Sequence, residues 1–196
     1  MSFLPDNYKI PSGGSRFMKL EPGKNTFRIL SDPIVGWEYW TEDGSKKVPI
    51  RVKEFKSVPS TRVHSKNPQE RPSHFWAMFV WNRETEMIQV LKITQATIQG
   101  GMKAYIDEAD WGDPKDYDFS ITKEGEGFDT RYTVIAKPHT GLEKEVTDLW
   151  KESKKDYDLT RMFDNGNVFG DDEERVEPTG RKKSSDGDLD DILNED

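Results

Sequence analysis

Two apolar β-type runs joined by a short polar link constrain the fold of this chain more than any other feature. Residues 74–81 are His-Phe-Trp-Ala-Met-Phe-Val-Trp, and residues 87–94 are Met-Ile-Gln-Val-Leu-Lys-Ile-Thr. Successive side chains of a strand point to opposite faces, and both faces of the first run are apolar and aromatic. The two runs predict a β-hairpin. Its first strand should be central in a sheet, or should bind a π surface on one face.

A third run, Lys47 to Phe55, has the cleanest alternation in the sequence. Val48, Ile50 and Val52 share one face of an extended chain. The opposite face carries cations and a ring, namely Lys47, Arg51, Lys53 and Phe55. We expect the aliphatic face to lie in the core and the cationic face to be exposed. Because Pro49 cannot donate a ladder hydrogen bond, we also expect an edge strand or a bulge here.

The order of the expected elements predicts the fold class. Strands over residues 25–31 and 34–41 precede the Lys47 run and the hairpin. A helix follows, and strands over residues 117–123 and 131–137 come last. This order predicts a mainly β fold, a five-stranded OB-fold barrel with an extra hairpin and a helix between strands three and four. A generic α+β sheet is the alternative.

The helix after the hairpin has a recognisable apolar face. Thr94 is a candidate N-cap, and the apolar positions that follow have helical spacing: Ile98, Met102, Tyr105 and Ile106. Gly100 and Gly101 inside this stretch each cost roughly 1 kcal/mol of helix stability.

The chain divides into four expected segments. Residues 1–24 form an arm rich in proline and glycine, and residues 25–140 form the OB-fold domain. Residues 141–170 form a helical extension, with Val146, Leu149 and Trp150 on one helical face. Residues 171–196 have the composition of a disordered acidic tail.

The net charge of −8 combines two regions of opposite sign. Residues 171–196 hold 11 acids and 4 bases, whereas residues 44–103 hold 11 bases and 4 acids. The chain therefore has a basic centre of charge +7 and an acidic end of charge −7, and the centre suits a polyanionic ligand.

The composition and the motifs exclude several classes of function. The absence of cysteine excludes disulfides and thiolate metal sites and fits a reducing cytoplasm. No apolar run approaches the roughly 20 residues of a membrane span, and residues 1–6 lack a signal-peptide pattern. The stretch Gly23-Lys24-Asn25 lacks the further glycine and the Ser or Thr of a phosphate loop. The carboxylates between Asp107 and Asp118 lie at an expected helix end and turn, where Asp is common. We therefore do not expect them to form the magnesium site of a nuclease. We expect a non-enzymatic protein without metal or cofactor.

Cations and aromatic rings occur together in the basic centre. Single-stranded nucleic acid needs cations for its phosphates and flat rings for its unstacked bases. Any single ring can equally be core, but six Trp and ten Phe exceed what one small core requires. We expect at least two of the rings to stack on bases. The candidate nucleic-acid-binding residues are Trp37, Tyr39, Trp40, Lys46, Lys47, Arg51, Lys53, Phe55, Lys56, Arg62, Lys66, Arg71, Trp76 and Trp81.

The last 11 residues combine charge with large aliphatic side chains. They carry six acids and no base, and Leu189, Ile192 and Leu193 have the spacing of one helical face. An inert solubilising tail is the alternative. We also expect the acids to compete with nucleic acid for the basic centre. The candidate partner-binding residues are Asp188, Leu189, Asp190, Asp191, Ile192 and Leu193.

Three stretches resemble the single-stranded-DNA-binding proteins of tailed phages. They are residues 17–30 (Phe-Met-Lys-Leu-Glu-Pro-Gly-Lys-Asn-Thr-Phe-Arg-Ile-Leu), residues 36–40 (Gly-Trp-Glu-Tyr-Trp), and residues 117–132 (Tyr-Asp-Phe-Ser-Ile-Thr-Lys-Glu-Gly-Glu-Gly-Phe-Asp-Thr-Arg-Tyr). The resemblance implies an OB fold that coats single strands in replication, recombination and repair, in the cytoplasm of the infected bacterial host. It also implies that the tail contacts a polymerase, helicase or recombinase. Some relatives hold a structural zinc, which a chain without cysteine cannot bind in the same way. Bacterial relatives often end in an aromatic residue, whereas this chain ends Asn-Glu-Asp.

Two other functions fit the sequence less well. One is a protein-interaction adaptor in which the barrel is a scaffold and the tail docks partners. The other is a barrel that binds RNA or an oligosaccharide, since a fold alone does not select a ligand. The basic face of Lys47 to Phe55 argues against a sugar and for a polyanion.

Overall fold

Strand β5 (Ser73–Asn82) is the central strand of the sheet in the computed structural model of this chain. It pairs antiparallel with β2 (Gly23–Ile29), β3 (Ile34–Asp43) and β6 (Met87–Ile93). The predicted hairpin is β5 and β6, so both the hairpin and the central position of its first strand are confirmed.

The structure describes residues 15–43, 46–59 and 71–170, and these belong to one compact unit. The side chains of residues 42, 43, 46 and 47 are not part of this description. Three sets of predictions therefore lie outside the described residues: the arm before residue 15, the basic residues Arg62 and Lys66, and the acidic tail after residue 170.

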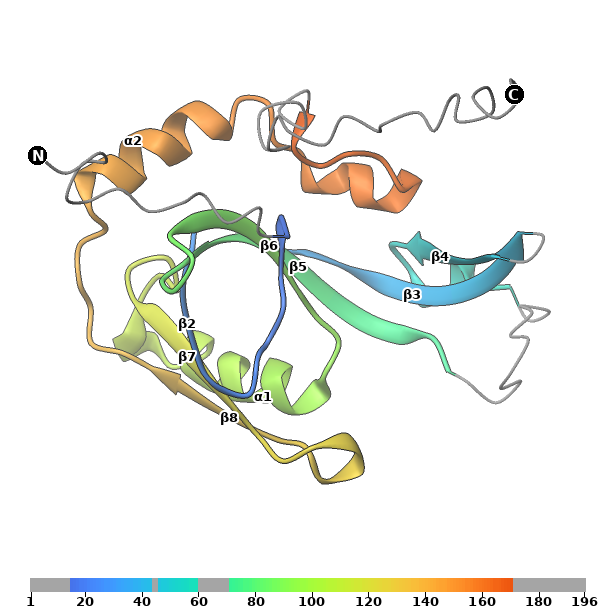
Figure 1. Ribbon diagram of the computed structural model, residues 1–196, viewed down its shortest axis with the longest axis horizontal. Helices are drawn as coiled ribbons and strands as arrows, with labels where there is room; N and C mark the ends of the chain where they lie inside the picture. Colours follow the sequence, from blue (N-terminus) through green and yellow to red (C-terminus); the bar gives the residue numbers. More distant parts are fainter. Residues whose placement is uncertain (1–14, 44–45, 60–70, 171–196) are drawn as a thin grey trace, which may run out of the picture. The chain divides into compact units, whose positions relative to one another are not determined.

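The sheet has eight strands and is not closed (Figure 1). Its main path is β1–β6–β5–β2–β7–β8, and β3 and β4 branch from β5. The remaining strands are β1 (Phe17–Met18), β4 (Lys46–Val52), β7 (Asp118–Glu124) and β8 (Arg131–Ala136). The mainly β class is confirmed, but the five-stranded closed barrel is not. The main path ends at β1, which pairs parallel with β6, and at β8, which pairs with β7, and β1 and β8 do not pair with each other.

Helix α1 (Ala96–Ile106) lies between β6 and β7 in the chain, where a helix was predicted. Ile98 and Met102 are fully buried, as their spacing predicted. Thr94 is not its N-cap: Gln95 holds that position, and no side chain caps the helix. Gly101 has a packing role, because a Cβ there would lie 2.9 Å from Val134 on β8.

Two apolar clusters cover the two faces of the sheet. The first contains Ile98 and Met102 of α1 with Met78 and Val80 of β5. The second packs Phe75 and Phe79 of β5, with their neighbours, against the C-terminal extension. Figure 1 shows α1 on one side of the sheet and the extension on the other. Both faces of β5 are apolar because α1 packs against one face and the C-terminal extension packs against the other.

The C-terminal extension consists of α2 (Lys144–Ser153), the 3₁₀ helix η4 (Leu159–Asp164) and the chain around them. Val146 of α2 is buried in the second cluster, whereas Leu149 is 48% exposed. Phe79 of β5 contacts the rings of Trp150 and Tyr157 at centroid distances of 5.4 and 5.2 Å. An aromatic core therefore attaches the extension to the sheet.

A charged network ties the start of this extension to the strands. Asp118 of β7 accepts hydrogen bonds from Arg28 at 2.6 Å and from Arg83 at 3.0 Å. Arg83 also donates to Glu143, just before α2, at 2.6 Å. These bonds hold the pKa of Arg83 above its ordinary value against the opposing effect of burial, and the pKa of Glu143 is lowered by hydrogen bonds from its backbone and from Arg83.

Strands β3 and β4 form a two-stranded arm. Residues 34–38 of β3 pair with β5, whereas residues 37–43 pair with β4. Beyond residue 38 the arm therefore has no third strand beside it among the described residues, and Figure 1 shows it extending from the sheet. Pro49 lies in β4, which pairs only with β3 in the described part of the chain, so the predicted edge strand is confirmed.

Candidate nucleic-acid interface

Alternate residues of β3, β4 and the start of β5 point to one common face of the arm. Directly paired residues of antiparallel strands share a face, and the strand registers bring these side chains together. We call this surface the aromatic face. Its members are Val35, Trp37, Tyr39, Thr41, Val48, Ile50, Val52, His74 and Trp76.

The aliphatic residues of β4 lie on the aromatic face and not in the core. Val48, Ile50 and Val52 are half-buried, and neither apolar cluster of the described residues includes them. The prediction that they form a core face is wrong. The arm continues past the strands that could cover it, so its apolar side chains stay accessible to a ligand.

Trp37 is the middle one of three neighbouring rings on or beside the aromatic face. Its ring centroid lies 4.8 Å from that of Phe55 and 5.0 Å from that of His74, both in edge contact. Phe55 is 57% exposed, and Trp37 and His74 are half-buried. His74 is attached to α1, because its Nδ1 lies 3.2 Å from Gln99 Oε1. Partly exposed rings on a supported surface are what base stacking requires.

The opposite face of the arm holds a buried carboxylate. Glu38 is 6% exposed. It accepts hydrogen bonds from Arg51 Nε at 2.8 Å and from Lys92 Nζ at 2.7 Å. Arg51 also donates to the Met162 carbonyl at 3.3 Å and to Asn165 Oδ1 at 2.9 Å. The expectation of an exposed Arg51 is wrong, because a buried carboxylate needs a paired cation. Arg51 fastens β4 to the C-terminal extension.

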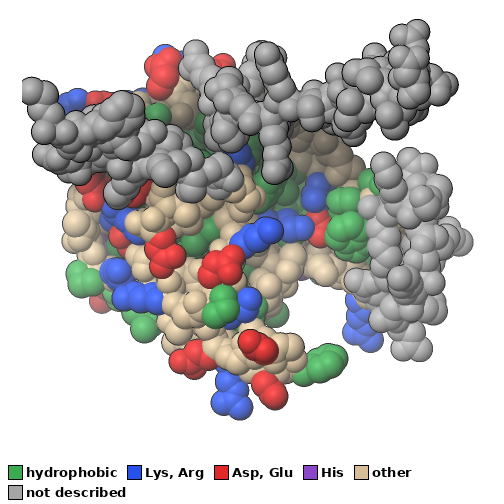
Figure 2. Space-filling view, in the orientation of Figure 1, with side chains coloured by type: hydrophobic (Ala, Val, Ile, Leu, Met, Phe, Trp, Pro, Cys, Tyr) green, Lys and Arg blue, Asp and Glu red, His purple; other side chains and the backbone are tan. Residues whose placement is uncertain are grey.

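The other predicted cations differ in their surroundings. Lys53 is exposed, with its Nζ 5.7 Å from the centre of the Phe163 ring. Lys56 is exposed and paired with Glu54 at 2.6 Å, and Arg71 is exposed. Lys46 and Lys47 lie in β4, and only their backbone is described. In Figure 2, hydrophobic side chains gather over β3 with basic side chains beside them.

The predicted tryptophans and Tyr39 separate by position. Tyr39 is half-buried on the aromatic face, and Trp40 is half-buried on the opposite face across from Pro49. Trp81 is only 9% exposed in the second cluster. A ring must be solvent-accessible to stack on a base, so the burial of Trp81 favours a role in core packing. Trp76 is half-buried and lines a pocket.

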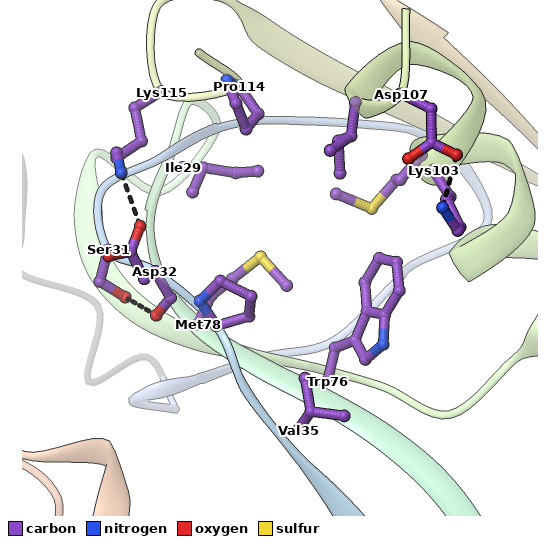
Figure 3. A pocket seen from close by; sticks show the side chains of 13 residues that line it. Ile29, Ser31, Asp32, Val35, Trp76, Met78, Lys103, Asp107, Pro114 and Lys115 are labelled. Carbon is purple, nitrogen blue, oxygen red and sulfur yellow. Dashed lines mark hydrogen bonds and ion pairs between the residues drawn. The ribbon is translucent and has the colours of Figure 1, made fainter.

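This pocket, of about 280 Å³, lies where the chain bends between β2 and β3 (Figure 3). Its wall is almost entirely apolar and comes from Ile29 of β2, Trp76 and Met78 of β5, and Met102 and Ile106 of α1. Sequence reasoning missed it, because its walls come from segments that are distant in the chain. The one local signal is Ser31-Asp32-Pro33, which interrupts an otherwise continuous strand pattern.

Two ion pairs lie at the rim of the pocket. Lys115 Nζ donates to Asp32 at 2.6 Å, and Lys103 pairs with Asp107 one helical turn away. Figure 3 shows these two pairs on opposite sides of the cavity. The hydrogen bond to Asp32 raises the pKa of Lys115 above its ordinary value.

The described residues contain no group of three or more His, Asp or Glu side chains arranged to hold a metal ion. Asp118, one of the carboxylates considered for a nuclease, is instead engaged by Arg28 and Arg83. In the same residues, no helix is long and apolar enough to span a membrane.

One curated protein is similar to this chain, the probable ssDNA-binding protein of Escherichia phage T5. The two are 26% identical over 147 residues, which is 63% of this chain and 57% of the phage protein. The chain thus spans little more than half the length of that relative. The resemblance to phage single-stranded-DNA-binding proteins is confirmed by this similarity. No described protein family matches the chain, and no solved structure matches it.

Proposed function

We propose that this chain binds single-stranded DNA without sequence preference and coats it during phage DNA replication, recombination and repair. The observation that carries the proposal is the similarity to the probable ssDNA-binding protein of phage T5. The aromatic face supports it, because its rings are partly exposed and two of its strands, β4 and β5, come from the basic centre of the sequence.

In this proposal the bases stack on the aromatic face and the phosphates meet the lysines around it. Trp37 and Phe55 are the first choice for stacking, since they are adjacent and Phe55 is largely exposed. Stacking of a base on an aromatic ring contributes roughly 1–3 kcal/mol and tolerates any base. Lys53 is exposed two residues before Phe55 in the chain and is the first choice for a phosphate contact.

The fold supports the proposal at a coarser level. β2 and β3 run in succession along β5, and α1 separates β6 from β7. We interpret this as an OB-like barrel left open at the β1 and β8 edges, and OB folds commonly bind oligonucleotides. The protein would then act in the cytoplasm of the infected host as a binding protein and not as an enzyme. Residues 186–196 would dock replication proteins.

A titration with three nucleic acids tests this function. Oligo-dT, oligo-rU and a duplex are added to the protein at several salt concentrations, and tryptophan fluorescence and the anisotropy of a labelled strand are measured. We expect tight binding of oligo-dT and weak binding of the duplex. The logarithm of the affinity should fall by about 0.7 per neutralised phosphate for each logarithmic unit of salt. Folded protein that leaves oligo-dT unbound at low salt would rule the function out, and a preference for oligo-rU would assign RNA instead.

A further inference from the structure

The pocket beside Trp76 continues the aromatic face. Val35 and Trp76 are directly paired across β3 and β5, and both belong to the aromatic face and to the pocket wall. The next pair on the same face, two residues further along β3, is Trp37 and His74. Val35 is 46% exposed. Single-stranded DNA that lies on the rings of Trp37, Phe55 and His74 would therefore reach the pocket without leaving the aromatic face.

The lining of the pocket suits a flat, polarisable ring. The thioethers of Met78 and Met102 and the indole of Trp76 line it together, and Figure 3 shows Met78 and Trp76 extending toward the cavity. Sulfur makes favourable contacts with aromatic rings, and the methionine side chain adapts to irregular shapes. An apolar wall offers few hydrogen bonds that would distinguish one base from another.

The charged groups are at the rim and not on the floor. Lys103 and Lys115 lie on opposite sides of the cavity, Lys103 beside Asp107, and Lys115 beside Asp32 and Asp113. A group that enters the pocket between two phosphates would place one phosphate toward each lysine. A linear apolar ligand would gain nothing from this pair of cations.

We propose that this pocket receives one unstacked base of the bound single strand, against Trp76, with the buried side chains of Met78 and Met102 behind it in the pocket wall. The phosphates on either side of that base then meet Lys103 and Lys115, and displace or share their aspartate partners. This inference rests on the proposed function, and it adds a binding site that grips a base independently of the rings around Trp37. Because the wall does not read base edges, the site is indifferent to sequence.

Methionine methyl NMR tests the proposal on the full chain. The six methionines are labelled at their methyl carbons, and Met78→Leu and Met102→Leu variants assign the two pocket signals. Oligo-dT is titrated in, and binding is followed separately by anisotropy. We expect upfield ring-current shifts of the Met78 and Met102 methyls. Met162, in the other cluster, should not shift. A chain of abasic phosphates of equal length should leave all these methyls unshifted.

A variant with a larger side chain at the pocket mouth can be compared with a matched variant elsewhere on the surface. Ile106 is 38% exposed at the pocket mouth, and Leu149 is 48% exposed on α2 away from it. The Ile106→Phe variant should lose the methyl shifts, and Leu149→Phe should keep them.

Four results would overturn the inference. Oligo-dT that binds by anisotropy without moving the two methyls would place the strand elsewhere and leave the proposed function standing. Equal shifts with the abasic chain would show that no base enters. A peptide of residues 186–196 that shifts the same methyls without DNA would assign the pocket to apolar side chains. Absence of any binding would remove the proposed function and this inference together.

Discussion

Arg51 and Lys53 are two residues apart in the chain, but their side chains have different surroundings and different roles. Arg51 compensates the buried Glu38 and bonds to the C-terminal extension, whereas Lys53 is exposed beside Phe163. Alternation alone places both on one face and says nothing about which cation a distant carboxylate will engage. A cation in a basic strand can therefore stabilise the fold as readily as it binds phosphate.

The variant Arg51→Ala should destabilise the protein. Removing one partner of a buried ion pair costs about 3–5 kcal/mol. Lys92 would still compensate Glu38, so we expect about 2–3 kcal/mol of lost unfolding free energy, measured by urea denaturation. Lys53→Ala is the control and should change stability by less than about 0.5 kcal/mol. It should lower DNA affinity and reduce the salt slope by about 0.7. Equal stability of the two variants would contradict this assignment.

Trp37→Ala and Trp81→Ala should separate stacking from packing. Trp37 is half-buried on the aromatic face, so its loss should weaken DNA binding by roughly 1–3 kcal/mol with little change in stability. Trp81 is buried in the second cluster, so its loss should cost about 3–5 kcal/mol of stability. Anisotropy of a labelled strand and urea denaturation measure the two quantities. The reverse pattern would move the interface to the β5 face that the extension covers.

At the scale of elements, α1 and β8 meet at a glycine. A Cβ on Gly101 would lie 2.9 Å from both Cβ and Cγ2 of Val134, whereas a Cβ on Gly100 would meet nothing within 4 Å. The sequence shows two helix-weakening glycines, and the structure shows that only Gly101 permits a close helix–strand contact.

The pair Gly101→Ala and Gly100→Ala tests this contact. The first variant must push α1 away from β8, and overpacking of this kind costs typically 1–3 kcal/mol. The second should gain about 0.5–1 kcal/mol, because alanine is the better helix former. Thermal or urea unfolding of the two variants is sufficient. A stabilised Gly101→Ala would show that the helix does not lie against Val134 at this distance.

The sequence predicted the secondary-structure elements well, but it predicted poorly which of them pack against one another. The apolar period of residues 74–94 is local, so the hairpin and its central strand could be inferred. Phe79 packs on Tyr157 and Trp150, about 70 residues further along the chain, and no local pattern contains that contact. The alternation in β4 was recognised, but the burial of its side chains depends on where β5 begins, at Ser73. The pocket was missed for the same reason, since its lining comes from four separate segments of the chain.

At the scale of the whole molecule, the acidic end of the chain should compete with DNA for the basic centre. Residues 186–196 carry six acids and follow a polar stretch that contains Gly180, Ser184 and Ser185. From the composition of this stretch we propose a transient contact between the acids and the basic centre. DNA must then displace the acids, which lowers its apparent affinity by the occupied fraction.

Deletion of residues 186–196 should therefore tighten DNA binding at low salt and much less at high salt, because screening weakens competition between polyanions. The midpoint of thermal unfolding should stay unchanged. Changing Leu189, Ile192 and Leu193 to Ala keeps all six acids and is the matched control. It should abolish binding to replication proteins and leave DNA affinity unaltered, because the competition depends on charge and the docking on apolar contact. If the deletion leaves low-salt affinity unaltered, the acids do not compete for the DNA site, and the aromatic face is open to DNA in the intact chain.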